Sequence, residues 1–168
     1  PDKCKYAVDE LCFDACIDYK LHKDAASLSK ALKEACPNGI DGHFENVGGM
    51  VLDAVLSRMN AFGRIAVCGM IAGYNGAPLP ITYPALILIN RPKLQGFIVT
   101  EHLEVWPEAL KELGTLVATG KPKPRESVSI GRDAAPEAFL GLPQGRHLRR
   151  PPGKPAHSFA GETRHTPP

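Results

Sequence analysis

The sequence predicts an α/β fold, with helices flanking a parallel sheet, over residues 1–142 and a disordered tail over residues 143–168. In the first part, segments with helical spacing of apolar residues alternate with short apolar runs typical of buried strands. The hydrophobic content of 43% and the charged content of 23% are ordinary for a globular protein. No apolar run approaches the roughly 20 residues that span a bilayer, so we expect no membrane segment.

Two helices and two strands are predicted in the first part of the chain. A weak apolar stripe indicates a helix over Lys3–Leu11, and a short apolar run indicates a strand over Ala15–Tyr19. One helical face of Asp24–Cys36 is apolar, and this helix ends at the turn Pro37–Gly39. The run Ile40–Val47 predicts a second strand, which leads into a pair of glycines.

The middle of the chain repeats this alternation. Apolar residues at helical spacing predict a helix over Val51–Met59, and Asn60–Gly63 has the composition of a turn. Arg64–Cys68 is a predicted strand because it is an apolar run that ends at a glycine. The apolar patch Tyr83–Ile89 predicts a helix, and Leu94–Val99 predicts the next strand.

Three further elements complete the predicted α/β part. A long helix over Trp106–Thr119 ends before Gly120–Pro122, Arg125–Ile130 is a candidate edge strand, and Ala134–Leu142 is a last helix. Strands that are separated by helices are joined by right-handed crossovers, which make the sheet parallel. Ligands of such sheets bind outside the carboxyl ends of the strands.

That rule points to three strand ends, Asn46–Gly49, Cys68–Tyr74 and Phe97–Thr100. Asn46 can donate one hydrogen bond and accept another, and the glycines after it allow a ligand to approach the backbone closely. In the alternative interpretation, Asn46 caps the next helix and the glycines only shape a turn. The spacing of these residues alone favours neither interpretation. Tyr74 offers a phenol, with a surface tyrosine as the alternative.

The predicted tail differs in composition from the rest of the chain. From Gly141 onward there are five basic residues and one acid, a charge of +4, which leaves −2 for the remainder of a chain whose net charge is +2. We therefore expect no nucleic-acid binding by the predicted α/β part. A segment rich in Pro, Arg and His buries too little apolar surface to fold. A solvated tail or a shifted reading frame is favoured over a nucleic-acid-binding tail.

Two common kinds of site are missing from the sequence. The five cysteines are odd in number and include no C-x-x-C pair, so we expect free thiols and no metal site. No G-x-G-x-x-G turn occurs, although a dinucleotide-binding domain normally opens with one. The chain is therefore either no nucleotide binder or begins after this fingerprint.

Three sequence segments together resemble one known family. They are ELCFDACIDYK at residues 10–20, GIDGHFENVGGMVLDAVLSRMNAFGRIAVCGMIAGYN at residues 39–75, and KLQGFIV at residues 93–99. The combination resembles the zinc-independent medium-chain dehydrogenases/reductases, in particular the NADPH-dependent alkenal/one oxidoreductases, which include leukotriene B4 dehydrogenase/prostaglandin reductases and curcumin reductases. The likeness covers about residues 1–142.

The resemblance implies an incomplete Rossmann-type domain, without the first strand, the glycine-rich turn and the second strand. It implies an intact enzyme that delivers hydride from NADPH to the β-carbon of an enone or enal. Lys3 is then expected to pair with the 2′-phosphate of NADP, and Tyr19 to lie near the adenosine. Asn46 is expected to contact the cofactor. The loop with Cys68, Gly69, Met70, Ile71 and Tyr74 is expected beside the nicotinamide half, and Phe97, Ile98 and Val99 are expected to meet the carboxamide. Tyr74 is also the candidate catalytic residue beside the substrate carbonyl, and no metal is required.

The sequence departs from the family at two places. Cys12 stands where the family usually has Gly, and the pattern ends after Leu142, for which we hypothesise a frame error or a gene fragment. Sequencing the codons for Leu142–Arg150 tests this. We expect the fragment alone to be inactive, the intact enzyme to be cytoplasmic and to act on a small-molecule enone or enal, and neither nucleic acid nor membrane to bind. A homodimer, a quinone-reductase-like oxidoreductase and a non-catalytic remnant that acts through a partner stay open.

Overall fold

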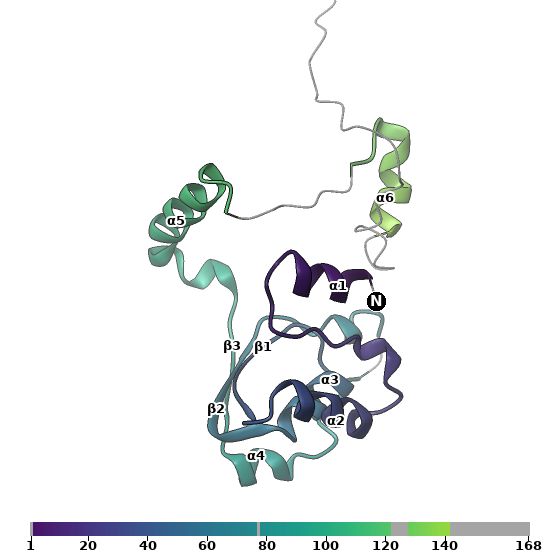
Figure 1. Cartoon of the computed structure of the whole chain (residues 1–168), viewed down its shortest axis with the longest axis vertical. Coiled ribbons are helices and arrows are strands. Elements are labelled where there is room, and N and C mark those ends of the chain that lie inside the picture. The colour runs from purple at the N-terminus through teal and green to yellow at the C-terminus, as the bar shows by residue number, and fades with distance from the viewer. Residues whose placement is uncertain (1, 77, 122–127, 142–168) are drawn as a thin grey trace, which may run out of the picture. The chain divides into compact units, whose positions relative to one another are not determined.

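The computed structural model describes residues 2–76, 78–121 and 128–141, and the chain divides into two compact units, Pro1–Pro122 and Lys123–Pro168. The first unit holds all the described strands and most of the helices (Figure 1). Its elements are α1 (Asp2–Asp9), α2 (Ala25–Ala35), β1 (Ile40–Glu45), α3 (Met50–Leu56), β2 (Met59–Val67), α4 (Ala85–Asn90), β3 (Lys93–Gly96) and α5 (Trp106–Ala118). In the second unit, the described residues form α6 (Ala135–Gly141) after a short 3₁₀ turn.

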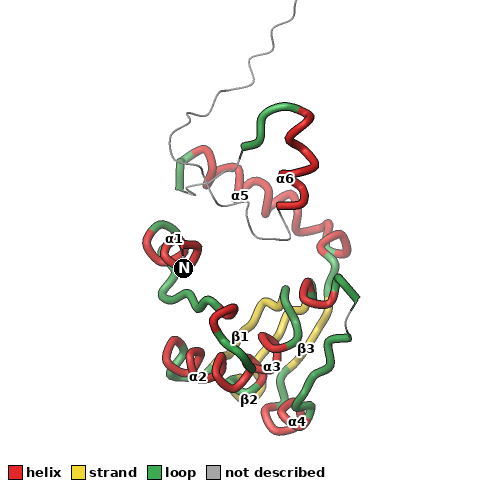
Figure 2. Tube along the Cα trace, turned by 90° about the vertical axis from the view of Figure 1, so that its right-hand side faces the viewer, coloured by secondary structure: helices red, strands yellow, loops and turns green. Residues whose placement is uncertain are grey.

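The three strands form a parallel sheet in the order β1-β2-β3, and Figure 2 shows them side by side. In the register, Glu45 lies opposite Val67, and Val67 lies opposite Gly96. All three strands therefore reach the same edge at their carboxyl ends. The predicted parallel α/β fold is confirmed, and so is the prediction that the strand-end segments share one edge.

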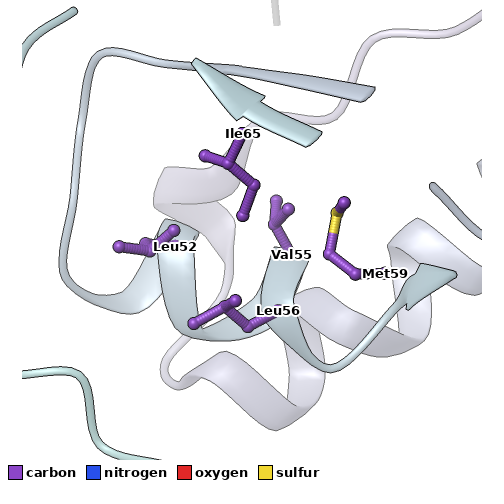
Figure 3. Packing of buried hydrophobic residues seen from close by; sticks show 5 residues of the cluster. All are labelled: Leu52, Val55, Leu56, Met59 and Ile65. Atoms are coloured by element: carbon purple, nitrogen blue, oxygen red, sulfur yellow. The ribbon is translucent and has the colours of Figure 1, made fainter. Parts of the chain in front are cut away.

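A small apolar core lies between α3 and the sheet. Its buried members come from α3 and from β2, and Figure 3 shows how their side chains point toward one another. They are Leu52, Val55, Leu56, Met59 and Ile65. From α2, Leu32 packs against this cluster, and the Asp24 carboxylate caps the helix by accepting from the Ser27 backbone N–H at 2.8 Å.

On the opposite face of the sheet, side chains of the described first unit are partly or largely exposed. Side chains alternate along a strand, so Ile65 points into the core and its neighbours Arg64 and Ala66 point away from it. On this outer face Phe44 is 61% exposed, and Phe62 in the same sheet is 70% exposed. Within the described residues, no helix has both the length and the apolarity that crossing a bilayer requires.

Two predictions about the secondary structure are wrong. Ala15–Tyr19 forms no strand, because a strand needs a neighbour for its hydrogen-bond ladder and the described sheet ends at β1. Asn60–Gly63 is not a turn between elements but part of β2, where the pairing with β1 shifts register between Ile40 and Gly42.

The other boundaries differ by a few residues. The predicted strand over Leu94–Val99 ends earlier, at Gly96, and a 3₁₀ turn begins at Val99. Of the predicted edge strand Arg125–Ile130, residues 125–127 lie outside the described residues, and residues 128–130 form no strand. The predicted tail over 143–168 also lies outside the described residues.

Candidate functional site

The carboxyl edge of the sheet brings together the predicted strand-end residues. The backbone N–H groups of Cys68 and Gly69 donate to the Glu45 carbonyl at 3.0 and 3.2 Å, and the Phe97 N–H donates to the Val67 carbonyl at 3.2 Å. Because these bonds continue the ladder past the strands, Asn46, Cys68 and Phe97 leave the sheet at neighbouring points.

Asn46, Cys68 and Tyr74 surround the small residue Gly69. The Cys68 Sγ lies 2.9 Å from the Asn46 Oδ1. A Cβ added to Gly69 would lie 3.1 Å from the Asn46 Oδ1 and 3.6 Å from the Tyr74 hydroxyl oxygen. Tyr74 is 73% exposed. The site therefore presents an amide and a phenol side by side over backbone that carries no side chain. We call these four residues the strand-edge cluster.

The loop after β2 is attached to the turn after β1 by main-chain bonds. The Ile71 N–H donates to the Asn46 carbonyl at 2.9 Å, and the Ala72 N–H donates to the Val47 carbonyl at 3.0 Å. Gly48 has a φ of 78°, a left-handed conformation that favours glycine, and a Cβ there would meet Leu79 and Met70 at 2.9 and 3.2 Å. The two predicted ligand-facing segments are thus one connected surface.

A buried carboxylate that sequence reasoning missed holds the turn after β1. Glu45 is fully buried, and its Oε1 accepts from the backbone N–H groups of Val47 and Gly48 at 2.5 and 2.8 Å. Its Oε2 lies 3.2 Å from the His43 Nε2. The local signal in the sequence is that the acidic residue Glu45 comes two residues before Val47 and three before Gly48, whose backbone N–H groups it can then bind.

A second missed carboxylate anchors the far end of the loop after β2. Asp53, on α3, is 5% exposed. Its Oδ1 accepts from the Thr82 backbone N–H at 2.9 Å, and its Oδ2 accepts from the Thr82 hydroxyl at 2.5 Å. The two partners are 29 residues apart, and sequence spacing holds no signal for such a contact.

The residues after β3 differ in exposure and in their contacts. The Phe97 ring lies 6.1 Å from that of Phe44, whereas Ile98 and Val99 are 63% and 60% exposed. Phe97 also lines a groove of about 400 Å³ on the outer face of β2 and β3. Its lining residues are Arg64, Ile65, Ala66, Lys93, Gln95, Phe97 and His102. The residues that line this groove include no member of the strand-edge cluster.

Lys3 and Tyr19 lie in other elements. Lys3 is an exposed residue of α1, and Tyr19 opens the 3₁₀ turn Tyr19–Leu21. Among residues 2–76, 78–121 and 128–141, no side-chain hydrogen bond or ion pair joins either residue to the strand-edge cluster. The same part of the chain holds no group of three or more His, Cys, Asp and Glu residues that could bind a metal ion.

Several known proteins with a similar sequence are named reductases. The chain is 38% identical to the NADPH-dependent curcumin reductase of Escherichia coli over 168 residues, which cover 96% of the chain and 46% of that protein. It is 42% identical to the NADP(+)-dependent 2-alkenal reductase of Nicotiana tabacum over 137 residues, which cover 81% of the chain and 39% of that protein. The chain thus spans less than half the length of these relatives.

Similar structures support the same grouping. The structure of CurA from Vibrio vulnificus in complex with NADPH is 40% identical, has a TM-score of 0.74, and is matched over 88% of this chain and 45% of that one. The predicted Rossmann-type fold and the predicted resemblance to NADPH-dependent reductases are confirmed. The sequence model of the zinc-binding dehydrogenases matches residues 1–132. Since this match covers more than half of the sequence, the chain belongs to the zinc-binding dehydrogenase family.

Proposed function

We propose that this chain is the nucleotide-binding part of an NADPH-dependent reductase that reduces the C=C bond of α,β-unsaturated ketones and aldehydes. The observation that carries the proposal is the strand-edge cluster, which occurs in a chain 40% identical to a protein solved with NADPH. The names of similar reductases, which refer to curcumin and 2-alkenals, indicate the substrate class.

The described residues fit the nicotinamide half of the dinucleotide. A Cβ at Gly69 would lie 3.1 Å from the Asn46 Oδ1, closer than an ordinary contact, so glycine keeps the backbone accessible beside the Asn46 amide and the Tyr74 phenol. A planar ring with a carboxamide can approach such a backbone closely, and Asn46 supplies hydrogen-bonding atoms for it. When bound, NADPH supplies the hydride. We assign Cys68, Gly69, Met70 and Ile71 to the wall beside the ring. We assign Phe97, which is half-buried, and the exposed Ile98 and Val99 to the carboxamide.

The pyrophosphate half has no matching residues in this sequence. No G-x-G-x-x-G turn occurs in the 168 residues, and the backbone N–H groups of such a turn grip the pyrophosphate. Lys3 and Tyr19 are proposed contacts at the adenosine end, because a basic residue suits a 2′-phosphate. We therefore expect the 168-residue chain alone to bind NADPH weakly or not at all.

Tyr74 is the proposed catalytic residue. Its exposed hydroxyl lies beside Gly69, next to the space assigned to the ring. A phenol can donate a hydrogen bond to a carbonyl oxygen of the substrate, and such a bond stabilises the negative charge that develops there. Replacement by Phe removes this donor and keeps the ring.

The test uses the full-length product of the source gene. NADPH oxidation is followed with an enone, an enal and a quinone as separate substrates. Turnover of the enone and enal, with a large loss in Tyr74→Phe, supports the proposal. Preferential turnover of the quinone would indicate the quinone-reductase-like alternative, and NADPH binding without any turnover would indicate a non-catalytic role. We also propose a cytoplasmic location, which fractionation of the source cells tests.

A further inference from the structure

The thiol of Cys68 has two neighbours that can accept a hydrogen bond. Its Sγ lies 2.9 Å from the Asn46 Oδ1 and 3.0 Å from the Glu45 carbonyl oxygen. A thiol carries a single hydrogen, so it can donate fully to only one of these oxygens at a time. Which oxygen receives it decides how the Asn46 amide is oriented.

The Glu45 carbonyl oxygen is already occupied. It accepts the backbone N–H of Cys68 at 3.0 Å and that of Gly69 at 3.2 Å. A carbonyl oxygen has two lone pairs, and these two bonds use both. The thiol hydrogen therefore goes to the Asn46 Oδ1, and the Asn46 NH₂ group is turned away from Cys68.

The NH₂ group of Asn46 then faces outward. Asn46 is exposed. Within the part of the chain that the structure describes, its side chain takes part in one hydrogen bond, at Oδ1, and Nδ2 donates none. In the flipped orientation the NH₂ group would face sulfur, a weak acceptor, and the thiol hydrogen would be left with the filled Glu45 carbonyl. The observed orientation is the one that satisfies more groups.

We propose that Cys68 is a positioning residue, whose thiol holds the Asn46 amide in the orientation that presents its NH₂ group outward to the ligand. This NH₂ group then donates to an acceptor oxygen, such as a carboxamide carbonyl or a ribose hydroxyl oxygen. The identity of the ligand as NADPH rests on the proposed function; the orientation of the amide does not.

The first experiment measures the amide orientation in the 168-residue chain. The ¹³Cγ resonance of Asn46 is compared in the wild type, Cys68→Ser and Cys68→Ala, with far-UV circular dichroism as the check on folding. Because an accepted hydrogen bond moves a carbonyl resonance downfield, we expect the wild type and Cys68→Ser to agree and Cys68→Ala to shift upfield. Identical resonances in all three proteins would overturn the proposal.

The second experiment measures NADPH affinity of the full-length gene product. Asn46→Asp keeps the shape and the acceptor but removes the donors, and we expect about tenfold weaker binding, the equivalent of one hydrogen bond. Cys68→Ala should weaken binding about threefold, and Cys68→Ser should restore it to within about twofold of the wild type. Asn75→Asp adds the same charge to the neighbouring loop as a matched control, and should change affinity less than about twofold.

The outcomes separate the two proposals. Undiminished NADPH binding by Asn46→Asp would show that Asn46 is not the donor, and equal affinities of Cys68→Ala and the wild type would remove the role of the thiol. If the full-length wild type does not bind NADPH at all, the proposed function fails. The ¹³Cγ comparison still decides whether Cys68 orients the amide.

Discussion

Replacing Glu45 should lower the stability of the chain far more than an ordinary surface substitution does. The fully buried carboxylate accepts from the backbone N–H groups of Val47 and Gly48 and contacts His43. In Glu45→Ala these donors lose their acceptor at once. Glu45→Gln keeps an oxygen for the two N–H groups and loses only the negative charge.

The expected magnitudes follow from the burial of these groups. Gly48 is buried, so its unsatisfied N–H costs about 1–3 kcal/mol, and the partly buried Val47 N–H can recover part of its bond from water. We therefore expect Glu45→Ala to lower the free energy of unfolding by about 3 kcal/mol. Glu45→Gln should lower it by about 1 kcal/mol, because bonds to a charged acceptor are stronger than those to a neutral one.

Urea unfolding followed by circular dichroism at 222 nm measures both effects. With a slope of about 1–2 kcal/mol per molar urea, a loss of about 3 kcal/mol lowers the midpoint by about 2 M. Glu112→Gln on the exposed surface of α5 is the matched control and should stay within about 0.5 kcal/mol of the wild type. The reasoning is refuted if Glu45→Ala unfolds at the same urea concentration as this control.

Four further outcomes are expected. Leu56→Ala, which empties a fully buried position, should lower the free energy of unfolding by about 2–5 kcal/mol in the same urea experiment. Thr82→Val removes the hydroxyl that donates to Asp53, and should lower the free energy of unfolding by about 1–2 kcal/mol in the urea experiment. It should also increase proteolytic cleavage in the loop after β2. Gly69→Val should weaken NADPH binding by the full-length gene product, because its Cβ would crowd Asn46; titration by NADPH fluorescence measures this, and unchanged binding would contradict the assignment of the ring. The bond from the Ser27 N–H lowers the pKa of Asp24. The cap that Asp24 forms therefore stabilises α2 at pH values above the ordinary Asp pKa of about 3.9, and this stabilisation is lost as the pH falls below that value. Helicity measured by circular dichroism should show this loss in the wild type and less of it in Asp24→Asn.

The sequence predicted the strand-edge cluster because its arrangement follows from topology. Parallel strands joined by helices must end at one edge, so the residues after β1 and β2 become neighbours whatever their side chains are. The main-chain bonds from Cys68 and Gly69 to Glu45 are a direct consequence. Periodicity within single elements was therefore sufficient to place Asn46 and Tyr74 on the same surface.

The prediction of a turn at Asn60–Gly63 was wrong because tertiary contacts, not turn geometry, require those residues. The Asn60 amide donates to the Asn38 carbonyl and to the Asp41 carboxylate, at 3.0 and 2.8 Å. A Cβ on Gly63 would lie 2.3 Å from the Met59 side chain and 3.1 Å from the Asp41 carbonyl. The composition of a segment shows that it is rich in small and polar residues, as turns are. Only the folded structure shows that here the small residue avoids a clash and the polar residue binds other segments.

Anchoring and ligand-facing roles are divided between different residues in this site. Glu45 and Asp53 are buried and hold the two loops, yet neither is assigned a contact with the ligand. Asn46 and Tyr74 are exposed, and among the described residues the one hydrogen bond that their side chains form is that from the Cys68 thiol to the Asn46 Oδ1. Substitutions of the first pair should therefore lower stability and reduce affinity only through unfolding. Substitutions of the second pair should reduce affinity or turnover of the full-length protein at nearly constant stability, and this separation makes the site assignment testable residue by residue.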